Sequence, residues 1–362
     1  MSGNNVNLDA RLVDLVNGTK DDLPFMSIEF FPPRTEAGIP KLYSVLEELH
    51  GQYQSLFADV TWGAGGSTSD LTLDLCKEIK KKGVVPNLHL TCTNMEKEKI
   101  DKALAGCVEA GITNILALRG DPPQGQTVWH ATEGGLTCAL DLVKYIRKSY
   151  ANMANEINIT VAGYPEGHPA AMTEVLDGYD SLTETEKKRC SIEKDAESGV
   201  EKIICCRDGD YEKELAYLKE KCDAGANAII TQMFFDADVY KQFVLDCRRI
   251  GIAETIPIIP GIMCISTFGG FNRMVGFCKT RVPRAMREAM DNANKAIDDS
   301  EAALKEAAAK VKEVGIELIF GLCKDLLSFG QSITPGLHFY TLNQGLTTSI
   351  LCDKLREESL IR

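Results

Sequence analysis

The sequence has little positive charge and no long hydrophobic run. Its 40 Lys and Arg residues face 52 Asp and Glu residues, which gives a net charge of -12, and no long basic cluster interrupts the chain. Such a chain repels nucleic-acid backbones and anionic lipid surfaces. The longest apolar segment, Ile256 to Ile265, is broken by Pro257, Pro260 and Gly261 and is shorter than the roughly 18 residues of a membrane helix. We therefore expect neither nucleic acid nor membrane as a partner.

Signals for secretion, disulfides and metal binding are also missing. Residues 1–22 are polar and lack the apolar core of a signal peptide. The 13 cysteines are scattered without a Cys-x-x-Cys pair, and only Cys205 and Cys206 adjoin, so we expect reduced, buried thiols. Five dispersed histidines offer no zinc-ligand spacing: His50, His89, His130, His168 and His338. These absences predict a cytoplasmic protein without a metal site.

The chain does contain a regular alternation of strand-like and helix-like segments. Helical patterns such as Leu71–Lys82 and Lys97–Ala110, the latter followed by Gly111, separate short runs of β-branched and aromatic residues. Eight such runs predict an α/β fold with a parallel sheet, closed as a (β/α)8 TIM barrel. The predicted strands are Phe25–Phe31, Phe57–Trp62, Pro86–Cys92, Asn114–Arg119, Ile157–Tyr164, Ala228–Phe234, Ile256–Met263 and Leu337–Leu342. An open doubly wound sheet is disfavoured, because Gly63-Ala64-Gly65-Gly66 lacks the third glycine of a dinucleotide fingerprint.

The expected organisation is one catalytic domain with two additions. Residues 1–24 form an N-terminal extension, residues 25–362 form the barrel, and residues 170–213 form a charged surface insertion between strands five and six. Within Asp180–Glu214, 18 of 35 residues are charged, which is typical of a solvated excursion. The helical stretch Pro283–Gly315 has more alanine than a solitary surface helix requires. We therefore expect a homo-oligomer.

Polar residues stand at the C-terminal ends of most predicted strands. This is where barrel enzymes carry their chemistry. In the first strand, Ser27 and Glu29 alternate with apolar neighbours and so face the barrel interior. An inward carboxylate near the mouth suits a general acid, whereas the structural alternative is an ion pair of Glu29 with Arg34 or Arg119. The other strand ends contribute Thr61, Trp62, His89, Thr91, Arg119, Gly120, Asp121, Tyr164, His168, Gln232, Tyr340 and Asn343.

Six short motifs follow the order of the predicted strands. They are SIEFFPPR (27–34), HLTC (89–92), ALRGDPP (117–123), AGYPEGHP (162–169), DAGANAIITQMFFD (223–236) and GLHFYTLN (336–343). Together they resemble methylenetetrahydrofolate reductase, a family of flavin-dependent (β/α)8 barrels. The resemblance implies reduction of 5,10-methylenetetrahydrofolate to 5-methyltetrahydrofolate by NADH or NADPH. It further implies ping-pong hydride transfer through FAD, in one-carbon metabolism and methionine biosynthesis.

The resemblance also assigns roles to individual residues. It implies that Glu29 is the proton donor and that Asp121 is a second catalytic carboxylate, which stabilises the cationic form of the folate. The nicotinamide nucleotide would contact Glu29, Phe30, Phe31, Pro32, Pro33 and Arg34. Flavin contacts are implied for Thr61, Trp62, His89, Arg119, Gly120, Asp121, Cys138, Ala139, Tyr164, His168, Pro169, Ala170, Ala171, Glu214 and Lys221. Folate contacts are implied for Asp121, Gln232, Tyr340 and Gln344.

Three departures from the family pattern matter. The segment from His168 to Lys221, which holds the charged insertion, is several tens of residues longer than the family pattern predicts. Gln344 stands where the family commonly has an arginine after Thr-Leu-Asn, so a charge for the glutamate tail of folate is absent. The chain ends at Arg362, so we expect no regulation through the S-adenosylmethionine-sensing domain of many eukaryotic relatives.

Three alternative functions stay open at this point. One is another flavin-dependent barrel, for instance one that oxidises proline, which would have no use for a pterin contact at Gln232. The second is a non-catalytic barrel that binds folate or a nucleotide, in which Glu29 is only an internal ion pair. The third, a pure interaction protein, fits the polar strand ends badly.

Overall fold

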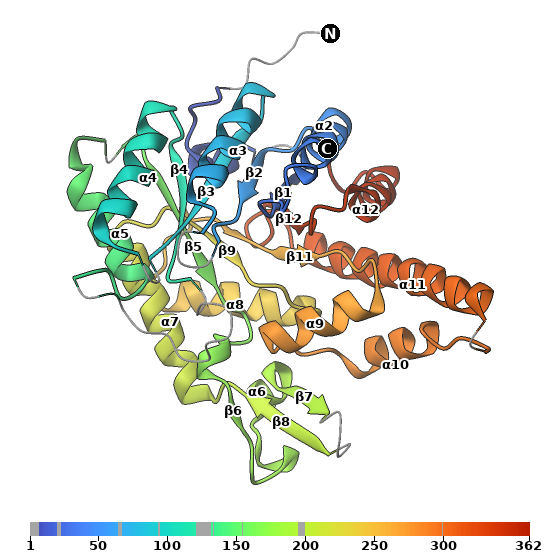
Figure 1. The fold of residues 1–362 in the computed structure, drawn as a ribbon. Helices are drawn as coiled ribbons and strands as arrows, with labels where there is room; N and C mark the ends of the chain where they lie inside the picture. Colours follow the sequence, from blue (N-terminus) through green and yellow to red (C-terminus); the bar gives the residue numbers. More distant parts are fainter. Residues whose placement is uncertain are drawn as a thin grey trace.

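The main sheet closes into a parallel barrel, as predicted (Figure 1). The computed structural model describes residues 7–19, 23–63, 67–92, 95–120, 132, 134–153, 155–194, 200–298 and 300–362. Nine parallel strands follow the order β10-β9-β5-β4-β3-β2-β1-β12-β11. Strands β10 and β11 are two halves of the seventh predicted strand, interrupted at Pro260, and they pair with β9 and β12 respectively. The sheet is therefore an eight-stranded barrel with one divided strand.

All eight predicted strands are present, and several end earlier than predicted. The sixth ends at Thr231 instead of Phe234, because the chain turns there toward the next helix. The barrel strands are β1 (Phe25–Phe30), β2 (Phe57–Val60), β3 (Val85–Thr91), β4 (Asn114–Leu118), β5 (Asn158–Gly163), β9 (Ala228–Thr231), β10 (Ile258–Ile259), β11 (Gly261–Met263) and β12 (Gly336–Tyr340).

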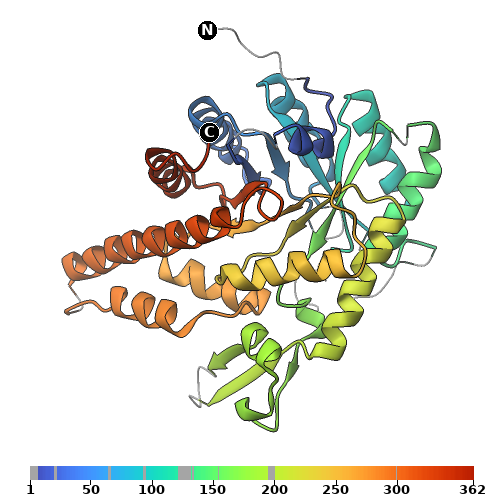
Figure 2. The ribbon, with the colours of Figure 1, turned by 180° about the vertical axis from the view of Figure 1, so that it is seen from behind.

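Helices surround this sheet and alternate with its strands (Figures 1 and 2). They are α1 (Leu12–Gly18), α2 (Gly38–Tyr53), α3 (Ser69–Lys81), α4 (Lys97–Glu109), α5 (Ala139–Ser149), α7 (Asp208–Asp223), α8 (Ala237–Arg249), α9 (Phe268–Cys278), α10 (Arg284–Ala293), α11 (Glu301–Ser328) and α12 (Gly345–Glu357). The two helices predicted in most detail are α3 and α4, and Gly111 follows α4 with φ of 61°, a conformation that favours glycine. Among the described helices, none combines the length and the apolar composition that crossing a bilayer requires.

The single helical stretch predicted for Pro283–Gly315 is wrong in its boundaries. It is two helices, α10 and the much longer α11, which lie side by side and extend away from the barrel (Figures 1 and 2). Ser300 begins the second helix, because its hydroxyl accepts a hydrogen bond from the backbone N–H of Ala303 (3.2 Å). The self-association inferred from this stretch stays a prediction.

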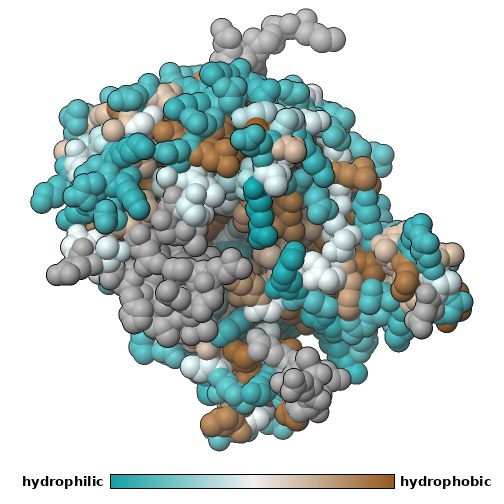
Figure 3. Space-filling model, in the orientation of Figure 1, coloured by the Kyte–Doolittle hydropathy of each residue, from teal (hydrophilic) through white to brown (hydrophobic). Residues whose placement is uncertain are grey.

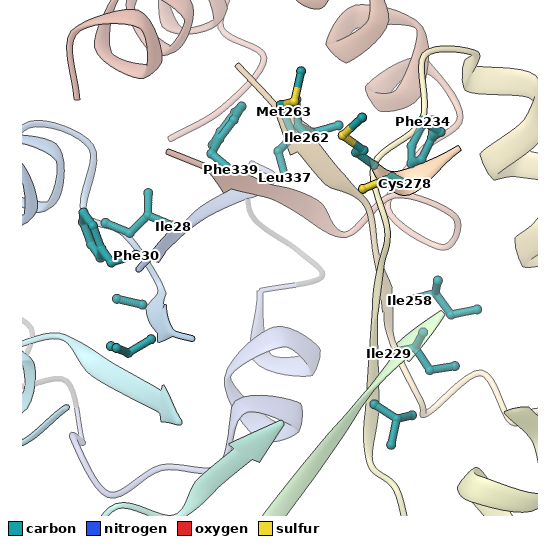
Figure 4. Packing of buried hydrophobic residues seen from close by; sticks show 14 of the residues in the cluster. Ile28, Phe30, Ile229, Phe234, Ile258, Ile262, Met263, Cys278, Leu337 and Phe339 are labelled. Carbon is teal, nitrogen blue, oxygen red and sulfur yellow. The ribbon is translucent and has the colours of Figure 1, made fainter. Parts of the chain in front are cut away.

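Two apolar layers hold the barrel together. Outward-facing side chains such as Ile28, Phe30 and Phe339 are fully buried under the helices (Figure 4). Inside the barrel, a smaller apolar cluster fills the N-terminal end and includes Leu12 and Val16 of α1. The N-terminal extension therefore closes the bottom of the barrel. The members of the inner cluster are Leu12, Val16, Phe25, Phe57, Val85, Leu116, Ala228, Ile230 and Ile259.

The charged segment after β5 folds as a separate three-stranded antiparallel sheet. Strand β8 (Glu201–Cys205) pairs with β6 (Thr173–Glu174) and β7 (Ser191–Lys194), next to helix α6 (Glu184–Arg189). This sheet spans a shorter range than the predicted 170–213, because α7 already begins at Asp208. Leu176, Ile192 and Val200 are exposed, and hydrophobic patches appear on this part of the surface (Figure 3).

Asn114 links the N-terminal extension to the barrel, and we expect its loss to destabilise the protein. Its Oδ1 accepts the backbone N–H of Leu12 (2.6 Å), and its Nδ2 donates to the carbonyl of Ala10 (3.1 Å). Asn114→Ala leaves these buried groups unpaired, which costs about 2–4 kcal/mol of unfolding free energy. Urea unfolding measures the loss, with the exposed Asn292→Ala as control at less than about 0.5 kcal/mol. Equal stability of the two variants would show that α1 does not depend on this contact.

Candidate functional site

The predicted site residues form two neighbouring groups at the C-terminal ends of the strands. One group lines a cavity beside β4, β5 and α7. The other is a buried polar cluster on β1, β2, β3 and β12, around Glu29. Asp121 lies outside the described residues, so its predicted role stays a prediction.

The cavity has a volume of about 380 Å³ and brings together residues far apart in the sequence. Nine predicted flavin contacts line it: Arg119, Cys138, Ala139, Tyr164, His168, Ala170, Ala171, Glu214 and Lys221. Sequence reasoning missed Tyr211, Tyr217 and Leu218 on its α7 wall, and Phe243 on α8. Helical spacing counted from Glu214 and Lys221 would have identified Tyr211 and Leu218, because residues three, four and seven apart share one helix face. No comparable signal marked Phe243.

Lys221 is a buried cation on the cavity wall. Its side chain is about 4% exposed, and its Nζ donates to the carbonyl of Ala162 (3.0 Å). Burial lowers its pKa to about 8, so the ammonium form is retained at neutral pH but only weakly favoured. Burial also raises the pKa of Glu214, although the positive charges of Lys221 and Arg119 act to lower it. An anionic ligand would find two cationic side chains here.

His168 is held as a neutral side chain on the cavity wall. Its Nδ1 accepts the backbone N–H of Ala170 (3.0 Å), and its ring stands edge-on to Tyr164 with centroids 4.6 Å apart. Burial and the charges of Arg119 and Lys221 lower its pKa to about 4. A histidine that stays neutral through the physiological range suits a ligand contact better than a general base.

Glu166 anchors the loop that carries His168. It is buried, and its Oε2 accepts the backbone N–H of Arg281 (2.9 Å), whereas its Oε1 has no partner. The Nζ of Lys279 donates to the carbonyl of Pro169 (3.1 Å). The connection between α9 and α10 thus fixes the cavity loop at two points. Burial, which outweighs the attraction of Arg281, raises the pKa of Glu166 to about 8.

The second group surrounds Glu29 inside the barrel. Glu29 faces inward, as predicted, and is about 7% exposed. Among the described residues, its partners within 4 Å are His89 Nε2 (3.6 Å) and His338 Nε2 (3.8 Å), not the arginines considered from the sequence. Asp59 lies beside it on β2, in register with Glu29, and accepts from His89 Nε2 (2.9 Å). Asn87 donates to the same Asp59 oxygen (3.1 Å).

Burial and charge act in opposite directions on His89. Burial alone would lower its pKa, but the hydrogen bond to Asp59 and the charges of Glu29 and Asp59 raise it. Oxygen or nitrogen atoms of Glu29, Asp59 and His89 all lie within 4.8 Å of one another, a spacing that a divalent cation could also use. Because the His89–Asp59 hydrogen bond already engages two of these atoms, we interpret the cluster as one that shares protons.

Sequence reasoning missed Asp59 and His338 as site residues. Asp59 alternates with Phe57 and Thr61 along the second strand, so the period-2 pattern already placed it on the inner face. His338 likewise alternates with Tyr340. The signal was present, but it did not show which inward residues meet.

The segment after Glu29 is tied to the last strand of the barrel. Asn343 accepts the backbone N–H of Phe31 (2.8 Å) and donates to its carbonyl (2.7 Å). The hydroxyl of Thr341 donates to the carbonyl of Glu29 (2.7 Å). These contacts fix the end of β1, which continues into Pro32, Pro33 and the exposed Arg34.

The remaining predicted residues lie at the expected strand ends but not on the cavity. Gln232 follows β9, and its Oε1 accepts the backbone N–H of Met233 (2.8 Å). The hydroxyl of Tyr340 donates to the carbonyl of Thr231, and Gln344 is exposed at the start of α12. Thr61 and Trp62 follow β2, and the buried Trp62 Nε1 has no partner. Gly120, which is also a predicted flavin contact, lies just after β4 and has φ of 94°.

Comparisons with known proteins identify close relatives. The family model of methylenetetrahydrofolate reductase matches residues 15–356. An Arabidopsis thaliana methylenetetrahydrofolate reductase (NADH) is 43% identical over 92% of this chain and 48% of its own length. A 5,10-methylenetetrahydrofolate reductase of Pectobacterium carotovorum is 31% identical over 91% of this chain and 89% of its own. The chain thus spans about half the length of the plant relative.

The fold is also similar to that of a solved structure. It is a Clostridium thermocellum protein that binds two copies of 5-methyl-5,6,7,8-tetrahydrofolic acid. The TM-score is 0.54 at 11% identity, and the match covers 94% of this chain and 99% of that one. At this identity, the likeness concerns the fold alone.

The buried Glu166 predicts a specific pH dependence of stability. Its pKa in the folded protein, about 8, lies above the ordinary 4.5, so its stabilising contribution is complete below the ordinary pKa and is lost as pH rises through about 8. Glu166→Gln should remove part of this loss, of the order of 3 kcal/mol between about pH 5 and about pH 9, since one pKa unit corresponds to about 1.4 kcal/mol. Urea unfolding at several pH values measures it. Parallel stability curves for the two proteins would contradict the assignment.

Proposed function

The chain belongs to the methylenetetrahydrofolate reductase family, and on this premise we propose that it reduces 5,10-methylenetetrahydrofolate to 5-methyltetrahydrofolate with NADH or NADPH. In this reaction the folate gains a hydride and a proton, so each turnover consumes one proton from water. The product would supply methyl groups for one-carbon metabolism and methionine biosynthesis. The observation that carries the proposal is the inward carboxylate of Glu29 beside a cavity at the C-terminal end of a (β/α)8 barrel.

The cavity residues fit an FAD cofactor. Lys221 and Arg119 offer positive charge for its phosphates, and the start of α5 at Cys138 and Ala139 opens on the cavity, where a helix N-terminus favours anions. Tyr164 and His168 offer ring surfaces. A bound FAD would supply the hydride transfer, taking a hydride from NAD(P)H and passing it to folate in two alternating, ping-pong half-reactions.

Orphaned polar atoms near the strand ends also fit a ligand with hydrogen-bonding edges. Trp62 Nε1 and Thr91 Oγ1 are buried without a partner, which is costly unless another molecule completes the bond. Trp62 follows β2, which pairs with the strand of Glu29, and Thr91 ends β3, the next strand of the sheet. A flavin or pterin ring carries acceptors and donors that would satisfy them.

Glu29 is the proton donor of this proposal. Opening the five-membered ring of the folate requires a proton on a ring nitrogen, and a positioned carboxylic acid accelerates such a step. Asp121, directly after Gly120, would stabilise the resulting cation by its negative charge, and Gln232 would hold the amide edge of the pterin. Tyr340 and Gln344 would complete the folate contacts.

A two-step spectroscopic experiment tests the proposal. The purified protein should be yellow, and NADH or NADPH should bleach it in the absence of oxygen. Adding 5,10-methylenetetrahydrofolate should restore the colour. Bleaching without restoration would instead indicate a different flavin-dependent barrel, and a colourless protein that binds folate would indicate a non-catalytic one.

Lys221→Met should weaken FAD binding. The substitution keeps the length of the side chain but removes its charge, so the dissociation constant should rise at least about tenfold, which corresponds to 1.4 kcal/mol. Equilibrium dialysis measures it. Lys219→Met on the same helix is the matched control, because Lys219 pairs with Asp223 and does not line the cavity. Unchanged affinity in Lys221→Met would remove this residue from the cofactor site.

Glu29→Gln should separate the two half-reactions. The amide has the same size but cannot donate a carboxylic proton, so re-oxidation by folate should slow by at least about a hundredfold, the usual range for a lost general acid. Bleaching by NAD(P)H should persist, because it needs no proton from Glu29. Stopped-flow absorbance follows each step. Equal losses in both steps would mean that Glu29 has a structural role.

A further inference from the structure

His338 lies at the centre of the barrel and has one nitrogen without a partner. The residue is fully buried, and its Nδ1 is hydrogen-bonded to Ser27 Oγ (2.9 Å). Its Nε2 makes no hydrogen bond but faces two carboxylate oxygens, Glu29 Oε2 at 3.8 Å and Asp59 Oδ2 at 3.9 Å. The bond to Ser27 and a stacked contact with Phe57 at 5.6 Å hold the ring in this orientation.

The two carboxylates near His338 Nε2 favour a proton that moves between the imidazole and Glu29. Glu29 and Asp59 are neighbours in register on adjacent strands, and both are buried. Two carboxylates so placed cannot both be charged unless protons or cations compensate them. Within the described ranges, no lysine or arginine forms an ion pair with either, so their cationic partners are His89 and His338.

Within the part of the chain that the structure describes, the titratable groups that face Glu29 come from three strands. Asp59 comes from β2, His89 from β3, and His338 and Tyr340 from β12. Burial and the charges of Glu29 and Asp59 raise the pKa of Tyr340 far above its ordinary value, so this hydroxyl stays neutral. Asp59 already accepts hydrogen bonds from His89 and Asn87. His338 Nε2 is therefore the uncommitted nitrogen that faces Glu29.

We propose that His338 carries the proton that restores Glu29 after each folate reduction, and that Asp59 positions and stabilises the protonated His338. This inference rests on the proposed function. In the step, the Nε2–H bond of the His338 imidazolium breaks and an O–H bond forms at Glu29 Oε2. The imidazole becomes neutral and later takes a proton from water, the same proton that the overall reaction consumes. The step is a proton transfer without oxidation or reduction.

The separation of His338 Nε2 and Glu29 Oε2 sets a condition on this transfer. A distance of 3.8 Å is longer than a direct hydrogen bond, so the proton passes through one water molecule or after a small rotation of Glu29. The unpartnered Asp59 Oδ1 offers an acceptor for such a water. Glu29 can thus regain a proton from the interior of the barrel while a ligand occupies the cavity.

His338→Gln tests the role of the imidazole. Gln can keep a hydrogen bond to Ser27 but cannot carry a proton. Re-oxidation by folate over repeated turnovers should fall at least about tenfold at mildly alkaline pH and much less at mildly acidic pH, where water protonates Glu29 directly. Bleaching by NAD(P)H should stay within about twofold of wild type. The matched control is His50→Gln on α2, remote from the cluster.

Asp59→Asn gives a second measurement that needs no substrate. In protein labelled with ¹⁵N-histidine, the variant should lower the pKa of His89, because it removes a hydrogen bond and a charge that raise it, and should change the signal of His338 Nε2, which faces Asp59. The descending limb of the pH profile for folate-driven re-oxidation should move to lower pH by about one unit. A shift in the histidine signals together with the kinetic change supports the proposal.

Other outcomes overturn the proposal. An unchanged pH profile in both variants would show that Glu29 recovers its proton elsewhere, even if the histidine signals shift. Equal slowing of both half-reactions would show that His338 is structural. If wild-type protein fails to re-oxidise with folate at all, the proposed function itself is wrong, and the histidine titration then still reports whether the cluster shares protons.

Discussion

The parallel pairing of β1 with β2 and β12 is the constraint on which the site depends. It fixes Glu29 next to Asp59 and Tyr340 in register and points the carboxylate of Glu29 into the barrel. The strands around the interior place their inward side chains in layers. The cluster at the N-terminal end of the interior is apolar, whereas Ser27, His338 and Glu29 above it are polar. The same strands thus build an apolar N-terminal end and a polar C-terminal end of the barrel.

The polar layer carries a cost that the apolar layers offset. Buried carboxylates and imidazoles lose their hydration, and unpaired atoms such as Asp59 Oδ1 add to that loss. A protein that needed only stability would gain by replacing them with well-packed apolar residues. Their arrangement is therefore best explained by chemistry at this end of the barrel.

The cavity beside this layer depends on contacts far from it in the sequence. Glu166 and Pro169 are held by the connection between α9 and α10. Gly167 has φ of 97°, and a Cβ there would lie 2.4 Å from the Cβ of Cys206, just before α7. The loop after β5, the connection between α9 and α10 and the start of α7 consequently pack together as one unit. Changes in the small antiparallel sheet that lies between them in the sequence would therefore alter the cavity.

The sequence by itself determined the eight strands, their inner and outer faces and the inward direction of Glu29, because period-2 alternation is a local property of each strand. It also pointed to Lys221 and Glu214, through resemblance. Only the tertiary structure decided that Asp59 and His338 meet at Glu29 in place of Arg34 or Arg119. It alone divided the seventh strand at Pro260 and folded the charged segment into a sheet. These features depend on the register between strands and on packing between distant segments. The residue pattern of a single segment specifies neither of them.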